Sequence, residues 1–374
     1  MSQDTSLIRP EIAALADYNA GLALDRFRAD YGVEARAKLD SNENPLGPAP
    51  AAIAAMRDCA AGIWRYPDAA DLALREAIGA ATGIDPEAVI VGNGSEDLIG
   101  AIYRSVLRPG DRVVTICPSF GLHEFGAQAF GARVEKVRFA EDWSFPLPGL
   151  VEALRQPARV LIFSSPSNPA GPAVSLEEFS ALLEAVSQGT LVVFDEAYRE
   201  YLDPTLAFDP CAIMREAGLD WISLRTFSKA YGLAGARVGY GLCSSPGLTR
   251  ALRKTRNPFA VNAFAGAAAL AALQDGAHLA RTVALARSER ARLSGALAAT
   301  GYAVVPSQAN FLFFRTPCPA ANFVETLRRR GVLIKGWQES PFLDWARVTI
   351  ATPVENDAFL EALPNLAASA ASQS

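Results

Sequence analysis

The sequence predicts an α/β protein in which a large domain, built on a mainly parallel sheet, is joined to a smaller α+β domain. From about residue 85 onward, short apolar runs alternate with helical patterns, which is typical of a parallel sheet with helices on both faces. The chain has 374 residues and so exceeds the usual size of a single domain. After about Pro258 the alternation gives way to a long helical region followed by short strands, which indicates a second domain.

Six apolar runs are expected to be strands of the large domain. They are Val89–Val91, Arg112–Ile116, Val160–Phe163, Leu191–Phe194, Trp221–Leu224 and Val238–Leu242. Helices should follow the first three strands, from Ser95 onward, near Leu122–Phe130 and at Leu176–Ser187. The small domain should contain a helical region up to about Ala299, a helix near Ala320–Arg330, and strands at Tyr302–Val305, Asn310–Phe314, Val332–Ile334 and Arg347–Ile350.

This pattern divides the chain into three parts. Residues 46–257 form the predicted large domain, and residues 258–374 form the predicted small domain. Residues 1–45 show no strand partners of their own. We therefore expect this N-terminal segment to pack on the small domain or to cover the cleft.

The composition excludes several classes of function. The net charge of -5 is mild and argues against a nucleic-acid surface. Five scattered cysteines without a C-x-x-C motif, and only two histidines, leave little material for disulfides, a metal site or a serine–histidine triad. The N-terminus does not resemble a signal peptide, and the apolar stretch Ala260–Leu273 is too short to span a bilayer. We therefore expect a cytoplasmic protein with no metal, nucleic-acid or membrane partner.

Polar residues follow the predicted strands at the edge where open α/β sheets bind ligands. Gly94, Ser95 and Glu96 lie in a turn that leads into a helix, where free N–H groups and the helix dipole favour a phosphate. Alternatively, Ser95 is a plain helix cap. Asp195 follows four apolar residues and should be buried, so it requires a cationic partner. That partner is either a protonated pyridine nitrogen or a structural salt bridge.

Lys229 follows another predicted strand and lies in a loop rich in small residues. Burial of a lysine lowers its pKa and makes its amine a nucleophile for a Schiff base. Ser228 and Arg237 flank it with a hydroxyl and a guanidinium, which suit a phosphate. A lone lysine would be a solvated surface charge, but this arrangement favours a cofactor site.

Several stretches resemble motifs of fold-type I enzymes that depend on pyridoxal-5'-phosphate (PLP). The segment Thr226–Tyr240 is similar to their lysine loop, Ser165–Gly171 to the S-P-N-N-P-T-G signature, and Asp195–Tyr198 to D-E-A-Y. Further stretches resemble the histidinol-phosphate aminotransferase family, namely Leu39–Pro48, Tyr66–Asp68 and Arg347–Ile350. The likeness runs in order from about residue 10 to residue 360.

The resemblance implies a role for each matching residue. Lys229, Asp195 and Tyr198 would be catalytic: Lys229 would bind PLP and later move the substrate proton, and Asp195 would pair with the pyridinium nitrogen. Asn168 and Tyr198 would hydrogen-bond the ring oxygen, and Phe120, where the family often has tyrosine, would stack on the ring. The cofactor phosphate would be held by Gly94, Ser95, Glu96, Ser228 and Arg237, and by Tyr66 from the partner subunit of a homodimer.

Four residues are candidates for substrate binding, namely Arg347, Lys335, Tyr18 and Asn44. Arg347 resembles the arginine that binds a carboxylate in related aminotransferases and a phosphate in histidinol-phosphate enzymes. It could instead be a surface arginine on an edge strand. Lys335 stands where the family usually has an arginine, and Ala351 replaces a usual glycine. Tyr18 would serve an imidazole or a phenyl ring equally well.

The resemblance implies a ping-pong transamination between histidinol phosphate and 2-oxoglutarate, in histidine biosynthesis. An aromatic amino-acid aminotransferase is the nearest alternative, and a PLP-dependent decarboxylase is a further one. Lys229, Asp195 and Arg237 do not separate these activities. A PLP-sensing transcription regulator would need a DNA-binding domain ahead of the PLP domain, and residues 1–45 are too few to form one. A catalytically inactive relative would lack the lysine.

Overall fold

The computed structural model describes residues 7–16 and 21–364, and its largest sheet has seven strands. In spatial order they are β2 (Val89–Gly92), β8 (Gly239–Cys243), β7 (Asp220–Thr226), β6 (Leu191–Asp195), β5 (Val160–Ser164), β3 (Arg112–Cys117) and β4 (Arg133–Arg138). Strand β8 pairs antiparallel with both neighbours, and the other neighbours pair parallel. The predicted α/β fold with a mainly parallel sheet is confirmed.

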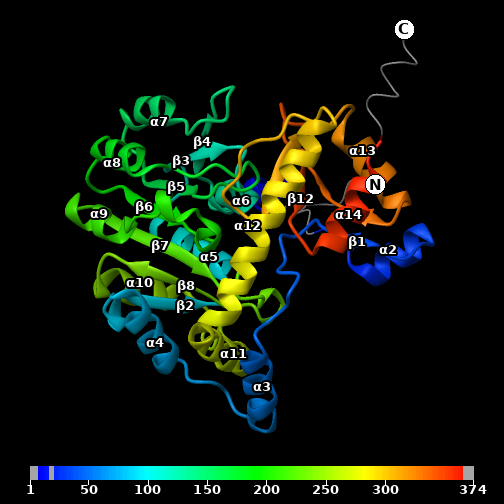
Figure 1. Ribbon diagram of the computed structural model, residues 1–374. Helices are drawn as coiled ribbons and strands as arrows, with labels where there is room; N and C mark the ends of the chain where they lie inside the picture. Colours follow the sequence, from blue (N-terminus) through cyan, green and yellow to red (C-terminus); the bar gives the residue numbers. More distant parts are fainter. Residues whose placement is uncertain (1–6, 17–20, 365–374) are drawn as a thin grey trace.

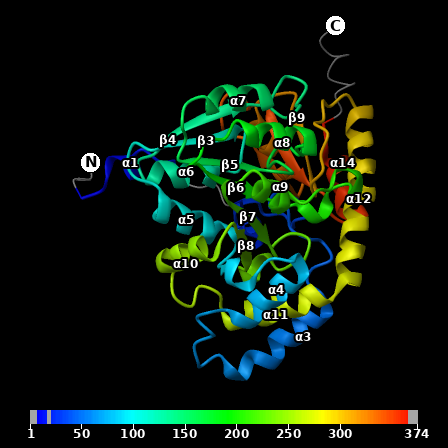
Figure 2. The same cartoon turned by 90° about the vertical axis from the view of Figure 1, so that its left-hand side faces the viewer.

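Helices cover both faces of this sheet, as Figure 2 shows. One face carries α5 (Ser95–Val106), α6 (Gly121–Ala129) and α10 (Pro246–Thr255). The opposite face carries α4 (Leu72–Thr82), α7 (Leu147–Leu154), α8 (Leu176–Glu184), α9 (Pro210–Glu216) and α11 (Ala263–Gln274), with α3 (Pro50–Cys59) packed on α11. Successive strand residues alternate between the two cores, so Ile90 joins the first while Val89 and Val91 join the second.

A second set of strands and helices packs beside the large sheet (Figure 1). Its antiparallel sheet contains β11 (Lys335–Gly336), β12 (Trp345–Thr349) and β9 (Phe311–Arg315), and a parallel pair joins β1 (Ala37–Lys38) to β10 (Val332–Leu333). The core is completed by α13 (Ala320–Arg329), α14 (Pro353–Ala362) and the end of α12 (Gly276–Ala299). This is the expected smaller α+β unit.

The N-terminal segment contacts both units. Contrary to expectation it has a strand partner, because β1 pairs with β10, and Tyr31 at the end of α2 (Leu24–Tyr31) donates to Glu325 over 2.6 Å. The short α1 (Pro10–Ala13) contacts α6 instead. The division at residues 45 and 258 stays a prediction, although α11 lies beyond residue 258 and still packs on α3 and α4.

Two other elements differ from expectation. Strand β4 was not expected, because its sequence alternates charged and apolar residues and its side chains are largely exposed at the sheet edge. The strand expected at Tyr302–Val305 is wrong: a single bridge joins Val304 to Phe314. Within residues 7–16 and 21–364, no helix is long and apolar enough to cross a membrane.

Candidate active site

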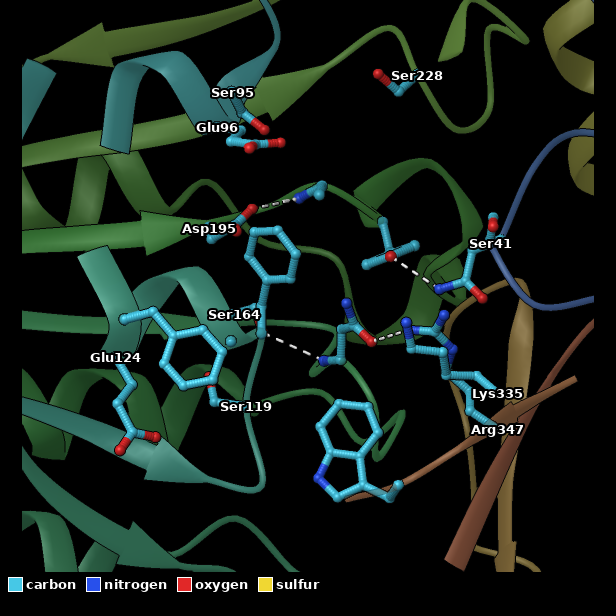
Figure 3. Close-up of a pocket in the computed structure, with 18 of the residues that line it drawn as sticks. Ser41, Ser95, Glu96, Ser119, Glu124, Ser164, Asp195, Ser228, Lys335 and Arg347 are labelled. Atoms are coloured by element: carbon cyan, nitrogen blue, oxygen red, sulfur yellow. Dashed lines mark hydrogen bonds between the residues drawn. The ribbon is translucent and has the colours of Figure 1, made fainter. Parts of the chain in front are cut away.

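A cavity of about 480 Å³ lies where the carboxyl ends of the parallel strands face the smaller sheet (Figure 3). Strands β3, β5, β6 and β7 run parallel, so their carboxyl ends meet at this edge. The lining includes twelve residues that the sequence indicates: Gly94, Ser95, Glu96, Phe120, Asn168, Asp195, Tyr198, Ser228, Lys229, Arg237, Lys335 and Arg347.

Three other candidates are not placed in this cavity. The Tyr66 side chain is 81% exposed and stacks on Phe259, with the ring centroids 4.5 Å apart. Asn44 is buried elsewhere, where its amide donates to the carbonyl of Ala230 over 3.0 Å and to the Thr282 hydroxyl over 3.1 Å. It therefore fixes its own turn against the lysine loop, and the structure does not bring it to the substrate side. Tyr18 lies outside the described residues.

One end of the cavity is a cradle for an anion, built at the start of α5. Gly94 has φ of 84° and is the N-cap residue, so the alternative in which Ser95 caps the helix is wrong. A Cβ at Gly94 would lie 2.8 Å from Arg237 Nη2. That guanidinium also lies 3.5 Å from Glu96 Oε2. Backbone N–H groups, two hydroxyls and a guanidinium thus converge here, with Ser95 and Ser228 on the same side in Figure 3.

Asp195 lies at the end of β6, between this cradle and the opposite end of the cavity, and is 4% exposed. Its Oδ1 accepts the Ala197 N–H over 3.0 Å, and its Oδ2 lies 3.2 Å from His123 Nε2. The other ring nitrogen of His123 lies 3.0 Å from Ser119 Oγ. His123 is not evident as a site residue from the sequence, because no local pattern indicates that α6 brings its ring to Asp195, which lies 72 positions away.

Lys229 follows β7 and points its amine toward the N-terminal segment. Its Nζ donates to the carbonyl of Ser41 over 2.9 Å and lies 5.8 Å from the centre of the Tyr198 ring. Burial, and then the nearby Arg347 guanidinium, lowers the pKa of Lys229 to about 7. The Tyr198 hydroxyl accepts the Asn42 amide over 3.0 Å, which fixes the ring beside that amine.

The other end of the cavity holds two cations on adjacent strands. Lys335 of β11 is opposite Arg347 of β12 in the register, and both line the cavity. Arg347 is 6% exposed and donates to Asn168 Oδ1 over 2.5 Å and to the Asp40 carbonyl over 2.8 Å, so the alternative of a surface arginine is wrong. Burial, and then Arg347, lowers the pKa of Lys335 to about 8.

The site therefore combines a nucleophilic amine and a buried carboxylate with an anion-binding region at each end. One region could hold the phosphate of a cofactor and the other the anionic group of a substrate. The described residues include no group of three or more His, Cys, Asp and Glu side chains that could hold a metal ion.

Comparisons with known proteins agree with this geometry. Residues 36–363 match the family model described as aminotransferase class I and II. The chain is 45% identical to histidinol-phosphate aminotransferase 1 of Mesorhizobium japonicum, covering 98% of this chain and 100% of the relative. It is 44% identical to histidinol-phosphate aminotransferase 3 of Rhizobium meliloti, covering 96% and 98%.

A solved structure supports the same relationship. It is the histidinol-phosphate aminotransferase of Sinorhizobium meliloti in complex with pyridoxal-5'-phosphate, which matches with a TM-score of 0.88 and 31% identity over 98% of both chains. From the family match, the near full-length relatives and this fold, the chain belongs to the class I and II aminotransferases.

Proposed function

We propose that this enzyme transaminates histidinol phosphate with 2-oxoglutarate, using PLP and the ping-pong exchange of aminotransferases. The observation that carries the substrate assignment is the pair of cations, Lys335 and Arg347, opposite each other in register at the end of the cavity away from the phosphate cradle. The names of the relatives at 45% and 44% identity support the same substrate.

The described residues fit PLP. Gly94 leaves open a space that a Cβ would fill against Arg237, and a Cβ at Gly239 would lie 2.4 Å from the backbone nitrogen of Ser95. The cradle is thus shaped by the absence of side chains, as a closely approached phosphate requires. Lys229 supplies an amine of lowered pKa, and Asp195 supplies a buried carboxylate.

In this proposal each residue around the cofactor has one task. Asp195, supported by His123, would hold positive charge at the ring nitrogen, and Asn168 and Tyr198, which line the same cavity, would hydrogen-bond the ring oxygen. Phe120 also lines the cavity and would cover one face of the ring. The phosphate would be held by Gly94, Ser95, Glu96, Ser228 and Arg237, joined by Tyr66 of the partner subunit.

When bound, the cofactor supplies an electron sink that allows the Cα–H bond of the substrate to break. Lys229 Nζ is the base that takes this proton and later returns it. Its lowered pKa suits the task, because above about pH 7 the amine is neutral and can accept a proton. Arg347, whose guanidinium is held in place by its bond to Asn168 Oδ1, binds the substrate's anionic group, which orients the Cα–H bond toward that amine.

A homodimer and a cytoplasmic location belong to the proposal. Ile63, Trp64 and Tyr66 are neighbours in the chain and are 55%, 74% and 81% exposed. Large apolar side chains exposed together indicate a surface that another protein covers. A second copy of the chain would bury them and receive Tyr66 at its own site.

The substrate is tested by kcat/KM for histidinol phosphate, histidinol and phenylalanine. The wild type should prefer histidinol phosphate. Arg347→Ala should lose about 2–5 kcal/mol of transition-state binding, because it removes a buried charge-assisted contact. Lys335→Ala should lose less, because an ammonium lacks the matched fork, and Lys335→Arg should retain or raise activity.

The aromatic alternative predicts a different pattern. A wild type that prefers phenylalanine, together with an unchanged Lys335→Ala variant, would replace histidinol phosphate by an aromatic amino acid as the substrate.

A further inference from the structure

An ion pair bridges the two domains at the wall of the cavity, separately from the cofactor-binding residues. Glu339 follows β11 in the small domain, and Lys136 lies on β4 of the large sheet. Lys136 Nζ lies 2.7 Å from Glu339 Oε1 and 3.0 Å from Glu124 Oε2. All three side chains line the cavity, and in Figure 3 Glu124 lies on the side away from Lys335 and Arg347.

Glu339 makes two further contacts that fix its carboxylate. Its Oε1 accepts the Cys117 thiol over 3.3 Å, and Cys117 is the last residue of β3. Its Oε2 accepts the indole N–H of Trp337 over 3.4 Å, and Trp337 also lines the cavity. One carboxylate thus joins the end of β3 and the neighbouring edge strand β4 of the large domain to the Trp337 side chain of the small domain.

This carboxylate is four residues from Lys335 along the same segment. Residues 335–339 all line the cavity, and within the small domain the segment is held by pairing of Lys335 and Gly336 with β12 and by a bond from the Trp337 N–H to the Trp345 carbonyl over 2.8 Å. Where Glu339 is anchored therefore affects where Lys335 stands relative to the large domain and its reactive amine.

We propose that Glu339 and Lys136 are positioning residues: an interdomain clasp that holds the Lys335-bearing segment against the large domain, so that the anion site is formed before substrate arrives. This rests on the proposed function, in which Lys335 meets the substrate anion. Such preorganisation improves substrate binding, because the binding energy need not be spent on ordering the segment. The clasp touches no reacting atom and leaves proton transfer at Lys229 unchanged.

Glu339→Gln is the variant that tests the clasp with the least disturbance of the fold. It removes one charge and keeps the shape, and Lys136 keeps its ion pair with Glu124. The domains also remain in apolar contact, because Trp143 packs on Trp345 and Phe342 with ring centroids 4.8 Å and 5.8 Å apart. Glu339→Ala is the stronger second variant. Glu135→Gln is the matched control. Glu135 lies beside Lys136 on β4, and its carboxylate pairs with Arg112 within the large sheet, so this variant removes an ion pair that does not join the two domains.

Two measurements on the holoenzyme decide the question. Hydrogen exchange without substrate should become faster in peptides covering residues 335–345 of both Glu339 variants. KM for histidinol phosphate should rise roughly 2- to 5-fold, with kcat essentially unchanged, because a partly exposed ion pair contributes modestly to positioning and not to the chemical step. Glu135→Gln should change neither quantity.

Unchanged exchange in both Glu339 variants would overturn the clasp. Faster exchange with an unchanged KM would overturn its positioning role. A lower kcat at unchanged KM would also overturn it, because that result would place Glu339 in the chemical step. If the wild type does not turn over histidinol phosphate, the proposed function fails instead, and the exchange measurement still decides whether the clasp holds the segment.

Discussion

Lys229 shows how position alone changes the chemistry of one residue. A lysine at the surface stays protonated well above neutral pH. Here the amine is enclosed at the end of β7, donates to the Ser41 carbonyl and lies near the Arg347 guanidinium. Burial and the positive charge of Arg347 both disfavour the protonated amine, so the pKa of Lys229 falls to about 7.

This lowered pKa predicts the pH dependence of PLP capture by the apoprotein. The nucleophile is the neutral amine, so the capture rate should fall as the pH drops below about 7 and level off above it. Arg347→Ala removes one cause of the shift and should move the midpoint to higher pH. Stopped-flow absorbance gives the midpoint, and borohydride reduction should place the cofactor on the Lys229 peptide. A midpoint near that of an exposed lysine, or a label on another lysine, would contradict the assignment.

At the same scale, the sequence predicts a residue best when it belongs to a contiguous motif. Lys229, Asp195 and Asn168 stand within recognisable stretches, and all three line the cavity. His123 and Glu339 do not. Their partners lie 72 and 203 positions away, so their contacts depend on how α6 and the segment after β11 are packed. No local pattern encodes that packing.

At the scale of elements, the turn from β2 into α5 is the part of the site in which backbone conformation matters most. Gly94 has a positive φ, which residues with a side chain rarely adopt, and its Cα lies against the Arg237 guanidinium. The Arg237 guanidinium is the far end of a flexible side chain, so it can move away from an added methyl group. An obstruction here should therefore affect ligand binding more than packing.

Gly94→Ala should weaken PLP binding roughly 10-fold or more, because the added Cβ displaces Arg237 from the phosphate cradle. It should also lower the free energy of unfolding by about 1–3 kcal/mol through backbone strain. Gly83→Ala is the control, since Gly83 also has a positive φ but has open space where the Cβ would stand. PLP titration of the apoprotein and thermal unfolding separate the two effects. Equal PLP affinity in both variants would show that the cradle is not at Gly94.

The elements also show which parts of the fold the sequence predicts. The central strands are continuous apolar runs, and they were placed correctly, because a strand buried on both faces leaves a strong signal. Strand β4 pairs with β3 at the edge of the sheet, and its many charged residues do not give the apolar pattern by which a strand is recognised in a sequence. The apolar run near Val304 has the same composition as a strand, but it makes only one bridge with Phe314. Whether such a segment forms a strand therefore depends on the neighbouring strand available to pair with it, and not on the β propensity of its residues.

At the scale of the whole molecule, one chain provides both walls of the cavity but leaves Tyr66 outside it. Tyr66 stacks on Phe259, and both side chains are exposed. The loop that carries Tyr66 is nevertheless well anchored, because Arg256 pairs with Asp71 over 2.7 Å and donates to the Ala69 carbonyl over 3.1 Å. A fixed loop that presents an exposed aromatic residue is suited to contact with a second copy of the chain.

The last prediction tests that arrangement by subunit exchange. Tyr66→Phe and Lys229→Ala should each impair the homodimer, the first by weakening the partner's phosphate site and the second by removing the reactive amine. In a mixed dimer, the Lys229 of the Tyr66→Phe subunit meets the intact Tyr66 of the other subunit, so one complete site is restored. When equal amounts of the two variants exchange subunits at random, about half of the dimers are mixed. Each mixed dimer has one complete site out of two, so activity should recover to about a quarter of wild type. The measurement is transaminase activity before and after subunit exchange, with the oligomeric state followed by light scattering. A monomer that transaminates, or exchanged subunits that recover nothing, would show that each chain completes its own site.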